Sequence, residues 1–162
     1  MLIIDVDDFK HINDSYGHMF GDTVLQNIAE KLPEVMEGGD MIARIGGDEF
    51  LVFIPDYQDE AAVLRRAESI LDTFGVICNS EPVQCAVTCS IGIACSPQDG
   101  KSFNQLFQHS DMALYYAKAG GKNVFARYDS EKMEWPFEWD RSHLVASTAI
   151  DSNCEEKGMV KK

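Results

Sequence analysis

The stretch that decides the fold reads MIARIGGDEFLVFI and runs over residues 41–54. Two apolar runs, 41–45 and 50–54, flank the tetrad Gly-Gly-Asp-Glu at 46–49. Paired glycines between two such runs are typical of a β-hairpin, because tight hairpin turns need positive φ angles. We therefore predict two antiparallel strands whose connecting turn carries two acidic side chains.

Working outward, the pattern alternates between short apolar runs and helical periodicity. The chain opens with an apolar run at 2–4 that leads into Asp5-Val6-Asp7, which predicts a buried strand with acids at its end. Ser102 is placed to cap a helix that ends at Gly120-Gly121. Helices are predicted around residues 22–32, 63–74 and 106–117, and further strands over 83–88, 90–94 and 124–128.

This order of elements predicts an α+β fold, with helices packed on a mostly antiparallel sheet. The patterned part, residues 1–128, is long enough to bury a core of its own and is predicted to form one domain. Residues 129–162 show no clear period and are treated as a poorly defined C-terminal tail.

Composition excludes several classes of function. The chain has 162 residues and a net charge of −13, so we exclude nucleic acid as a partner because its backbone would be repelled. No apolar run approaches the ~18–20 residues of a membrane span, and a signal-peptide layout is missing. The five cysteines are odd in number and lack C-x-x-C spacing, which disfavours structural zinc and disulfides. We predict no direct membrane contact and a cytoplasmic location, alone or as the cytoplasmic part of a larger membrane-attached protein.

Three acids meet if the opening strand lies beside the hairpin: Asp5, Asp48 and Glu49. Bare carboxylates repel one another, and a hard divalent cation removes that conflict. Two such ions can activate a hydroxyl and neutralise charge on a transferring phosphoryl group. The same acids could equally be solvent-exposed turn and strand-end residues. Spacing alone leaves both interpretations open.

The residues around the hairpin agree with one known pattern. The signature itself is Ile-Gly-Gly-Asp-Glu-Phe at 45–50. Other matching segments occur in the same order and spacing, at residues 4–10, 12–14, 16–18, 21–22, 90–94, 111–115 and 117–123. From about Leu2 to Tyr128 the chain resembles the GGDEF family, the diguanylate cyclases. The resemblance implies a nucleotidyl-cyclase or palm-like (ferredoxin-like) sheet with helices on its faces.

The resemblance also implies a metal site and catalytic residues. Asp5 and Asp48 would hold two Mg²⁺ or Mn²⁺ ions per active site, with the carbonyl of Val6 assisting. Asp48 and Glu49 would be the catalytic acids. Glu49 would be either a further metal ligand or the base that deprotonates the ribose 3′-hydroxyl, and the sequence does not separate these roles.

Asn13 and Asp22 correspond to the pair that reads guanine in the family. A carboxylate at position 22 can accept from guanine N1–H and N2–H₂ together, whereas adenine presents an acceptor at N1. A mismatched buried pair costs ~1–3 kcal/mol per unpaired group, so Asp22 favours GTP over other nucleotides.

Phosphate contacts are implied for Lys118 and Lys122 at the end of the last predicted helix, and for the backbone N–H groups around Asp8 and Phe9. The lysines could instead be ordinary cations at a helix C-terminus. Gly46 and Gly47 would let the substrate approach the backbone closely, or would simply make a good turn.

The implied reaction joins two GTP molecules into cyclic di-GMP with release of pyrophosphate. Because each site holds one nucleotide, two protomers must face each other, so a homodimer is implied. The alternative is a catalytically inactive signalling module that responds to GTP or to cyclic di-GMP.

Two departures from the family pattern matter. The inhibitory product site of the family uses Arg-x-x-Asp, and here Asp40 is retained while Glu37 stands in the arginine position. An acid cannot make the bidentate contacts of an arginine, so we predict no product feedback through this site. The family's helix ahead of the first strand is missing from this stretch, and we expect an upstream sensory domain in the parent protein.

Overall fold

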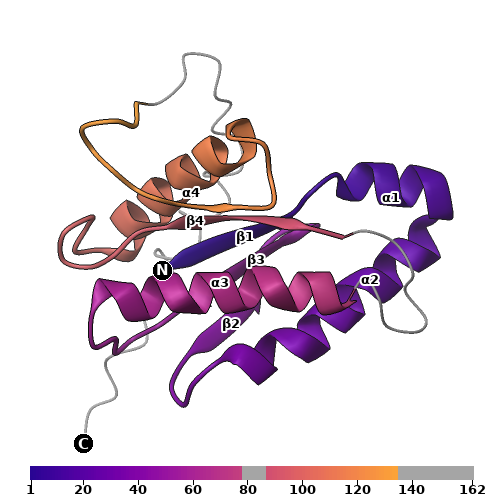
Figure 1. Ribbon diagram of the computed structural model, residues 1–162, viewed down its shortest axis with the longest axis horizontal. Helices are drawn as coiled ribbons and strands as arrows, with labels where there is room; N and C mark the ends of the chain where they lie inside the picture. The colour runs from indigo at the N-terminus through magenta and orange to yellow at the C-terminus, as the bar shows by residue number, and fades with distance from the viewer. Residues whose placement is uncertain (78–86, 135–162) are drawn as a thin grey trace, which may run out of the picture.

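The computed structural model describes residues 1–77 and 87–134. Within these ranges five strands form one sheet in the order β2-β3-β1-β4-β5 (Figure 1). The pairs β2–β3, β3–β1 and β1–β4 are antiparallel, and β4–β5 is parallel. The strands are β1 Leu2–Val6, β2 Met41–Arg44, β3 Glu49–Phe53, β4 Cys89–Ile93 and β5 Phe125–Arg127. The predicted α+β class and mostly antiparallel sheet are confirmed.

Helices cover both faces of the sheet. The last helix, α4, packs on one face over β4, β5 and β1, and α2 and α3 pack on the opposite side (Figure 1). A one-turn 3₁₀ segment, η1, connects α2 to the edge strand β2. The helices are α1 Phe9–Tyr16, α2 His18–Lys31, η1 Leu32–Val35, α3 Glu60–Ile77 and α4 Phe103–Ala119.

The central strand β1 is buried along its whole length. Because side chains alternate across a strand, Leu2, Ile4 and Val6 face the core beneath α2 and α3. Asp5 therefore lies on the other face, the one that α4 covers. This alternation places an acid of β1 near the C-terminal end of α4.

Close contact between α4 and β4 depends on Gly92 in the centre of β4. A Cβ atom at this position would lie 1.9 Å from the carbonyl oxygen of Ser110 and 2.3 Å from the amide nitrogen of Leu114. Both are backbone atoms of α4, so they cannot turn aside as a side chain could. Only glycine lets the helix axis come this close to the sheet.

Some local predictions were wrong. The helix expected around 22–32 begins at His18, and a separate helix, α1, precedes it. Gly17, with φ of 87°, separates the two helices, and α1 gave little signal because it buries only Ile12. The strand expected over 83–88 falls mainly outside the described residues.

The hairpin between β2 and β3 is present, but its turn differs from the prediction. Neither Gly46 nor Gly47 has a positive φ. A Cβ at position 46 would instead lie 2.7 Å from Oε2 of Glu49, so the glycine leaves room for that carboxylate. The N-cap prediction is confirmed, since the side chain of Ser102 accepts from the amide of Gln105 at 3.3 Å.

Candidate active site

The three acids predicted to meet do lie at one end of neighbouring strands. Asp5 of β1 stands opposite Glu49 of β3 in the antiparallel register. The amide of Val6 donates to the carbonyl oxygen of Asp48 at 3.2 Å, which extends the pairing into the turn. The hairpin therefore delivers both of its acids to the end of β1.

Asp5 is buried and holds a cationic partner. Its Oδ2 lies 2.8 Å from Nζ of Lys118, in the last turn of α4. Burial raises the pKa of Asp5 from 3.8 to about 6, because it disfavours the charged form, and Lys118 offsets part of this rise. The charges of Asp48 and Glu49 raise the pKa further. The carboxylates of Asp48 and Glu49 are thus near enough to Asp5 for their charges to act on it.

The turn that carries Asp48 is held by Arg44, for which no role was predicted. Nε and an Nη atom of Arg44 both donate to the carbonyl oxygen of Gly47, at 3.1 and 2.6 Å. The amide of Ile45 donates to the carbonyl oxygen of Glu49 at 2.9 Å. These bonds fix the turn whose side chains at 48 and 49 are half-buried.

The carboxylates at this end of the sheet are the type of ligand that a hard divalent cation binds. Among the described residues, no group of three or more His, Cys, Asp and Glu side chains is arranged so that it could hold a metal ion. However, Asp5 already accepts a positive group at 2.8 Å and is affected by two further carboxylates. Carboxylate oxygens, together with phosphate oxygens and water, are the ligands that Mg²⁺ prefers.

A buried carboxylate that sequence reasoning missed, Asp7, organises the strand ends. It accepts from the hydroxyls of Thr88 and Ser90, both at 2.7 Å, and from the amide of Asn123 at 3.0 Å. Its own amide donates to the carbonyl oxygen of Thr88 at 2.9 Å. Its position two residues after Asp5, on the same strand face, was the available signal. Asp7 therefore has a structural role, because its hydrogen bonds connect the end of β1 to β4 and to the loop between α4 and β5.

The second predicted lysine also meets an acid. Nζ of Lys122 lies 2.6 Å from Oδ1 of Asp8, which is exposed and has φ of 54°. The hydrogen bond from Lys122 lowers the pKa of Asp8. The adjacent α1 begins at Phe9, so the amides of Asp8 and Phe9 lie at its N-terminal end, where a helix favours anions.

The packing of α1 on α2 places Asn13, one of the two predicted guanine-reading residues, against the residue that precedes the other, Asp22. A Cβ at Gly21 would lie 2.0 Å from Oδ1 of Asn13 and 3.1 Å from Cζ of Phe9. The amide side chain of Asn13 therefore rests on Gly21, directly before Asp22, which is exposed. Gly21 is a further residue to which sequence reasoning assigned no task of its own.

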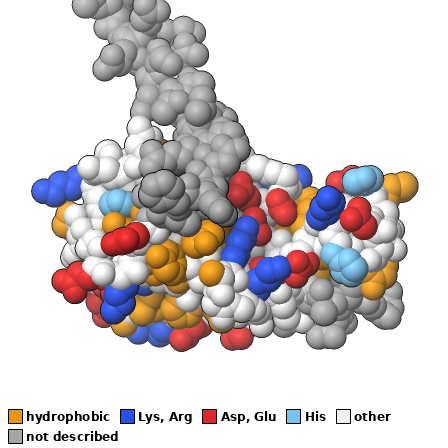
Figure 2. Space-filling view, turned by 90° about the horizontal axis from the view of Figure 1, so that it is seen from above, with side chains coloured by type: hydrophobic (Ala, Val, Ile, Leu, Met, Phe, Trp, Pro, Cys, Tyr) orange, Lys and Arg blue, Asp and Glu red, His pale blue; other side chains and the backbone are white. Residues whose placement is uncertain are grey.

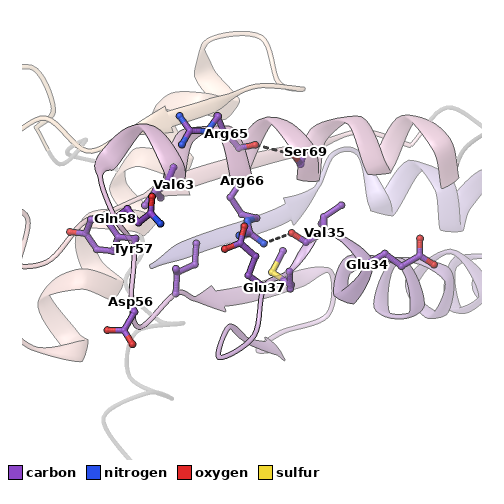
Figure 3. A pocket seen from close by; sticks show the side chains of 13 residues that line it. Glu34, Val35, Glu37, Asp56, Tyr57, Gln58, Val63, Arg65, Arg66 and Ser69 are labelled. Carbon is purple, nitrogen blue, oxygen red and sulfur yellow. Dashed lines mark hydrogen bonds and ion pairs between the residues drawn. The ribbon is translucent and has the colours of Figure 1, made fainter.

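The two residues predicted to mark a degenerate product site, Glu37 and Asp40, both pair with an arginine of this chain. Arg66 of α3 lies 2.5 Å from Glu37 and also donates to the carbonyl oxygen of Val35 (Figure 3). The same arginine lies 3.3 Å from Asp40. The Asp40 side chain is only 4% exposed and also accepts from the amide of Glu37 at 2.9 Å. A cavity of about 520 Å³ opens beside this cluster, at the opposite end of β3 from Glu49. Asp40 thus has its partners within the chain.

Charges of both signs are mixed on the surface. Figure 2 shows acidic and basic side chains interleaved on the face that it displays, although the whole chain carries −13. No helix within residues 1–77 and 87–134 is long and apolar enough to cross a membrane.

Comparison with known proteins agrees with this arrangement of fold and acids. The family model described as "Diguanylate cyclase, GGDEF domain" matches residues 1–124. The chain therefore belongs to the GGDEF domain family.

Two curated relatives illustrate the likeness. The chain is 34% identical over 139 residues to the cyclic di-GMP phosphodiesterase PdeR of Escherichia coli, covering 86% of this chain and 21% of the relative. It is 40% identical over 119 residues to the diguanylate cyclase TpbB of Pseudomonas aeruginosa, covering 73% and 27%. The chain spans about a quarter or less of the length of these relatives.

Solved structures show the same fold. The GGDEF domain of PA1120 (YfiN or TpbB) from Pseudomonas aeruginosa matches with a TM-score of 0.73 and 34% identity, over 79% of this chain and 80% of that chain. An EAL/GGDEF domain protein from M. capsulatus matches with a TM-score of 0.70 and 38% identity, over 79% and 83%.

Proposed function

We propose that residues 1–128 form a diguanylate cyclase domain, which condenses two GTP molecules into cyclic di-GMP and pyrophosphate. The observation that carries this proposal is the buried carboxylate of Asp5, opposite Glu49 and beside the backbone of Asp48. An acid kept at a buried strand end, next to two others, costs stability and is expected where a cation is bound.

The residues that would hold two Mg²⁺ or Mn²⁺ ions are Asp5, Asp48, Glu49 and the carbonyl of Val6. Such ions, when bound, neutralise charge on the triphosphate and acidify the attacking hydroxyl. The hairpin fixes the two turn acids relative to β1, so the site is positioned before substrate arrives.

In the reaction, the 3′-oxygen of one GTP bonds to the α-phosphorus of the other, and the bond from that phosphorus to the pyrophosphate oxygen breaks. Glu49 either takes the 3′-hydroxyl proton or holds a cation, in which case water takes the proton. Asn13 and Asp22 orient guanine by its edge, and the lysines at 118 and 122 neutralise the phosphates. The amides of Asp8 and Phe9 at the start of α1 add phosphate contacts, and the small residues Gly46 and Gly47 let the nucleotide lie against the turn.

The ring closes when this step has taken place twice, with one GTP on each of two protomers that face each other. We therefore propose a homodimer as the active form, working in the cytoplasm where GTP is available.

The test is incubation of the purified protein with GTP and Mg²⁺ or Mn²⁺, with chromatographic detection of cyclic di-GMP. We expect product from the native chain and none from Glu49→Gln, whose side chain keeps its size but loses its charge. GTP binding without any product in the native chain would refute the cyclase proposal.

That second outcome would instead support a nucleotide-responsive module without turnover. The relative that favours this alternative is PdeR, which is named a phosphodiesterase although its matching region is similar to this chain.

A further inference from the structure

Two ion pairs connect the end of α4 to the end of β1. Lys118 contacts Asp5 at 2.8 Å and Lys122 contacts Asp8 at 2.6 Å. The first pair differs from the second in burial, because the Asp5 side chain is 11% exposed and that of Asp8 is 64% exposed. Loss of the ion-pair partner is more costly for a buried carboxylate than for an exposed one, because little water is available to solvate the charge instead.

The loop that carries the second lysine is fixed independently of both pairs. Asp7 accepts from the amide of Asn123 at 3.0 Å, and Lys122 and Asn123 both have left-handed backbone angles, 64° and 51°. The hydrogen bond from Asn123 attaches this loop to the end of β1 without using either ion pair.

A divalent cation and an ammonium cannot both contact one carboxylate oxygen without strong repulsion. The Lys118 side chain is 38% exposed, so its ammonium has solvent to move into at the rim of the same site. We propose that Lys118 is an exchangeable counter-ion, which neutralises Asp5 in the metal-free protein and transfers to the nucleotide phosphates when a divalent cation takes the carboxylate. This inference rests on the proposed function, because it assumes that the site receives a metal and a triphosphate.

The exchange couples the two ligands. A metal ion that takes Oδ2 of Asp5 must displace the lysine, so it binds more weakly than the carboxylates would otherwise allow. Triphosphate arriving with metal gives the released ammonium a new anionic partner, so each ligand favours the other. Lys118 therefore weakens metal binding when nucleotide is absent and strengthens nucleotide binding when metal is present.

The experiment measures Mn²⁺ binding by the electron paramagnetic resonance signal of the free ion, without nucleotide, in the full chain and in Lys118→Met. We expect the variant to bind Mn²⁺ about fivefold to tenfold more tightly. With saturating Mn²⁺, its affinity for a GTP analogue that has an uncleavable α–β bridge should fall by about tenfold.

Lys132→Met is the matched control, because Lys132 is paired with Asp129 at 2.8 Å outside the site. It should leave Mn²⁺ affinity unchanged. Equal or weaker Mn²⁺ affinity in Lys118→Met would overturn the inference. Absence of Mn²⁺ binding to both native chain and variant would overturn the proposed function as well.

A measurement on the native chain covers the case in which the variant does not fold. The ¹⁵N resonance of the Lys118 ammonium should shift on addition of Mg²⁺, while that of Lys132 stays in place. A Lys118 resonance that is unmoved at saturating Mg²⁺ would contradict the exchange.

Discussion

The substitution Asp5→Asn is expected to stabilise the metal-free protein while it destroys the proposed metal site. The folded state raises the pKa of Asp5 from 3.8 to about 6, mainly through burial. An acid with a raised pKa in the folded state holds its proton more strongly there than in the unfolded chain. The contribution of Asp5 to stability is therefore most favourable below pH 4 and is lost as the pH rises from about 4 to about 6.

The magnitude follows from the size of the pKa change. About two pKa units at ~1.36 kcal/mol each give a cost of about 3 kcal/mol once Asp5 is ionised in both states, above pH 6. The contribution of Lys118 is already contained in this figure, because the ion pair lowers the same pKa. At pH 5 the carboxyl is mainly protonated in the folded state, and the cost is only about half as large.

The assay is urea unfolding in the presence of EDTA, at pH 8 and at pH 5, for the native chain and Asp5→Asn. The free energy of unfolding should rise by about 3 kcal/mol at pH 8 and by about 1.5 kcal/mol at pH 5. Asp8→Asn is the control, because Asp8 is exposed and its pKa is lowered by Lys122, so this substitution should not stabilise at either pH. Lower stability of Asp5→Asn at pH 8, or an equal gain at both pH values, would refute the reasoning.

Other regions of the chain give three further predictions. Gly92→Ala should lower the free energy of unfolding by about 3 kcal/mol or more, because its Cβ would meet the backbone of α4 at 1.9 Å; a loss below about 1 kcal/mol in urea unfolding would contradict that close approach. Gly21→Ala should displace the amide of Asn13 and raise KM for GTP about tenfold in steady-state cyclase assays, and an unchanged KM would argue against guanine contact by Asn13. Added cyclic di-GMP should leave the cyclase rate unchanged, because Arg66 already pairs with Asp40 at 3.3 Å; strong inhibition that Asp40→Ala abolishes would show the opposite.

Much of the fold was predictable because burial leaves a periodic pattern in the chain. The apolar runs at 2–4, 41–45 and 50–54 predicted β1, β2 and β3, and Ser102 predicted the start of α4. The pattern failed where periodicity was weak, as in α1, which buries a single side chain, Ile12. Local signals of this kind depend only on neighbours along the chain.

Some features of the candidate site were likewise predictable from the sequence, and others were not. The positions of Asp5, Asp48 and Glu49 followed from a strand end and a hairpin turn, and their convergence required only that β1 pair with β3. The turn geometry at Gly46 was not predictable, since a Glu49 side chain rather than a positive φ explains the glycine.

The sequence by itself identified the candidate acids and lysines, and it predicted β1, β3 and α4, in or beside which they lie. Only the tertiary structure decided that Lys118 contacts Asp5, 113 positions away, and that Asp7 joins three segments of the chain. It also decided that Arg66 forms an ion pair with Asp40. Such pairings depend on sheet register and on the rotation of a helix over a sheet, which are properties of the packed molecule and leave no periodic signal along the chain.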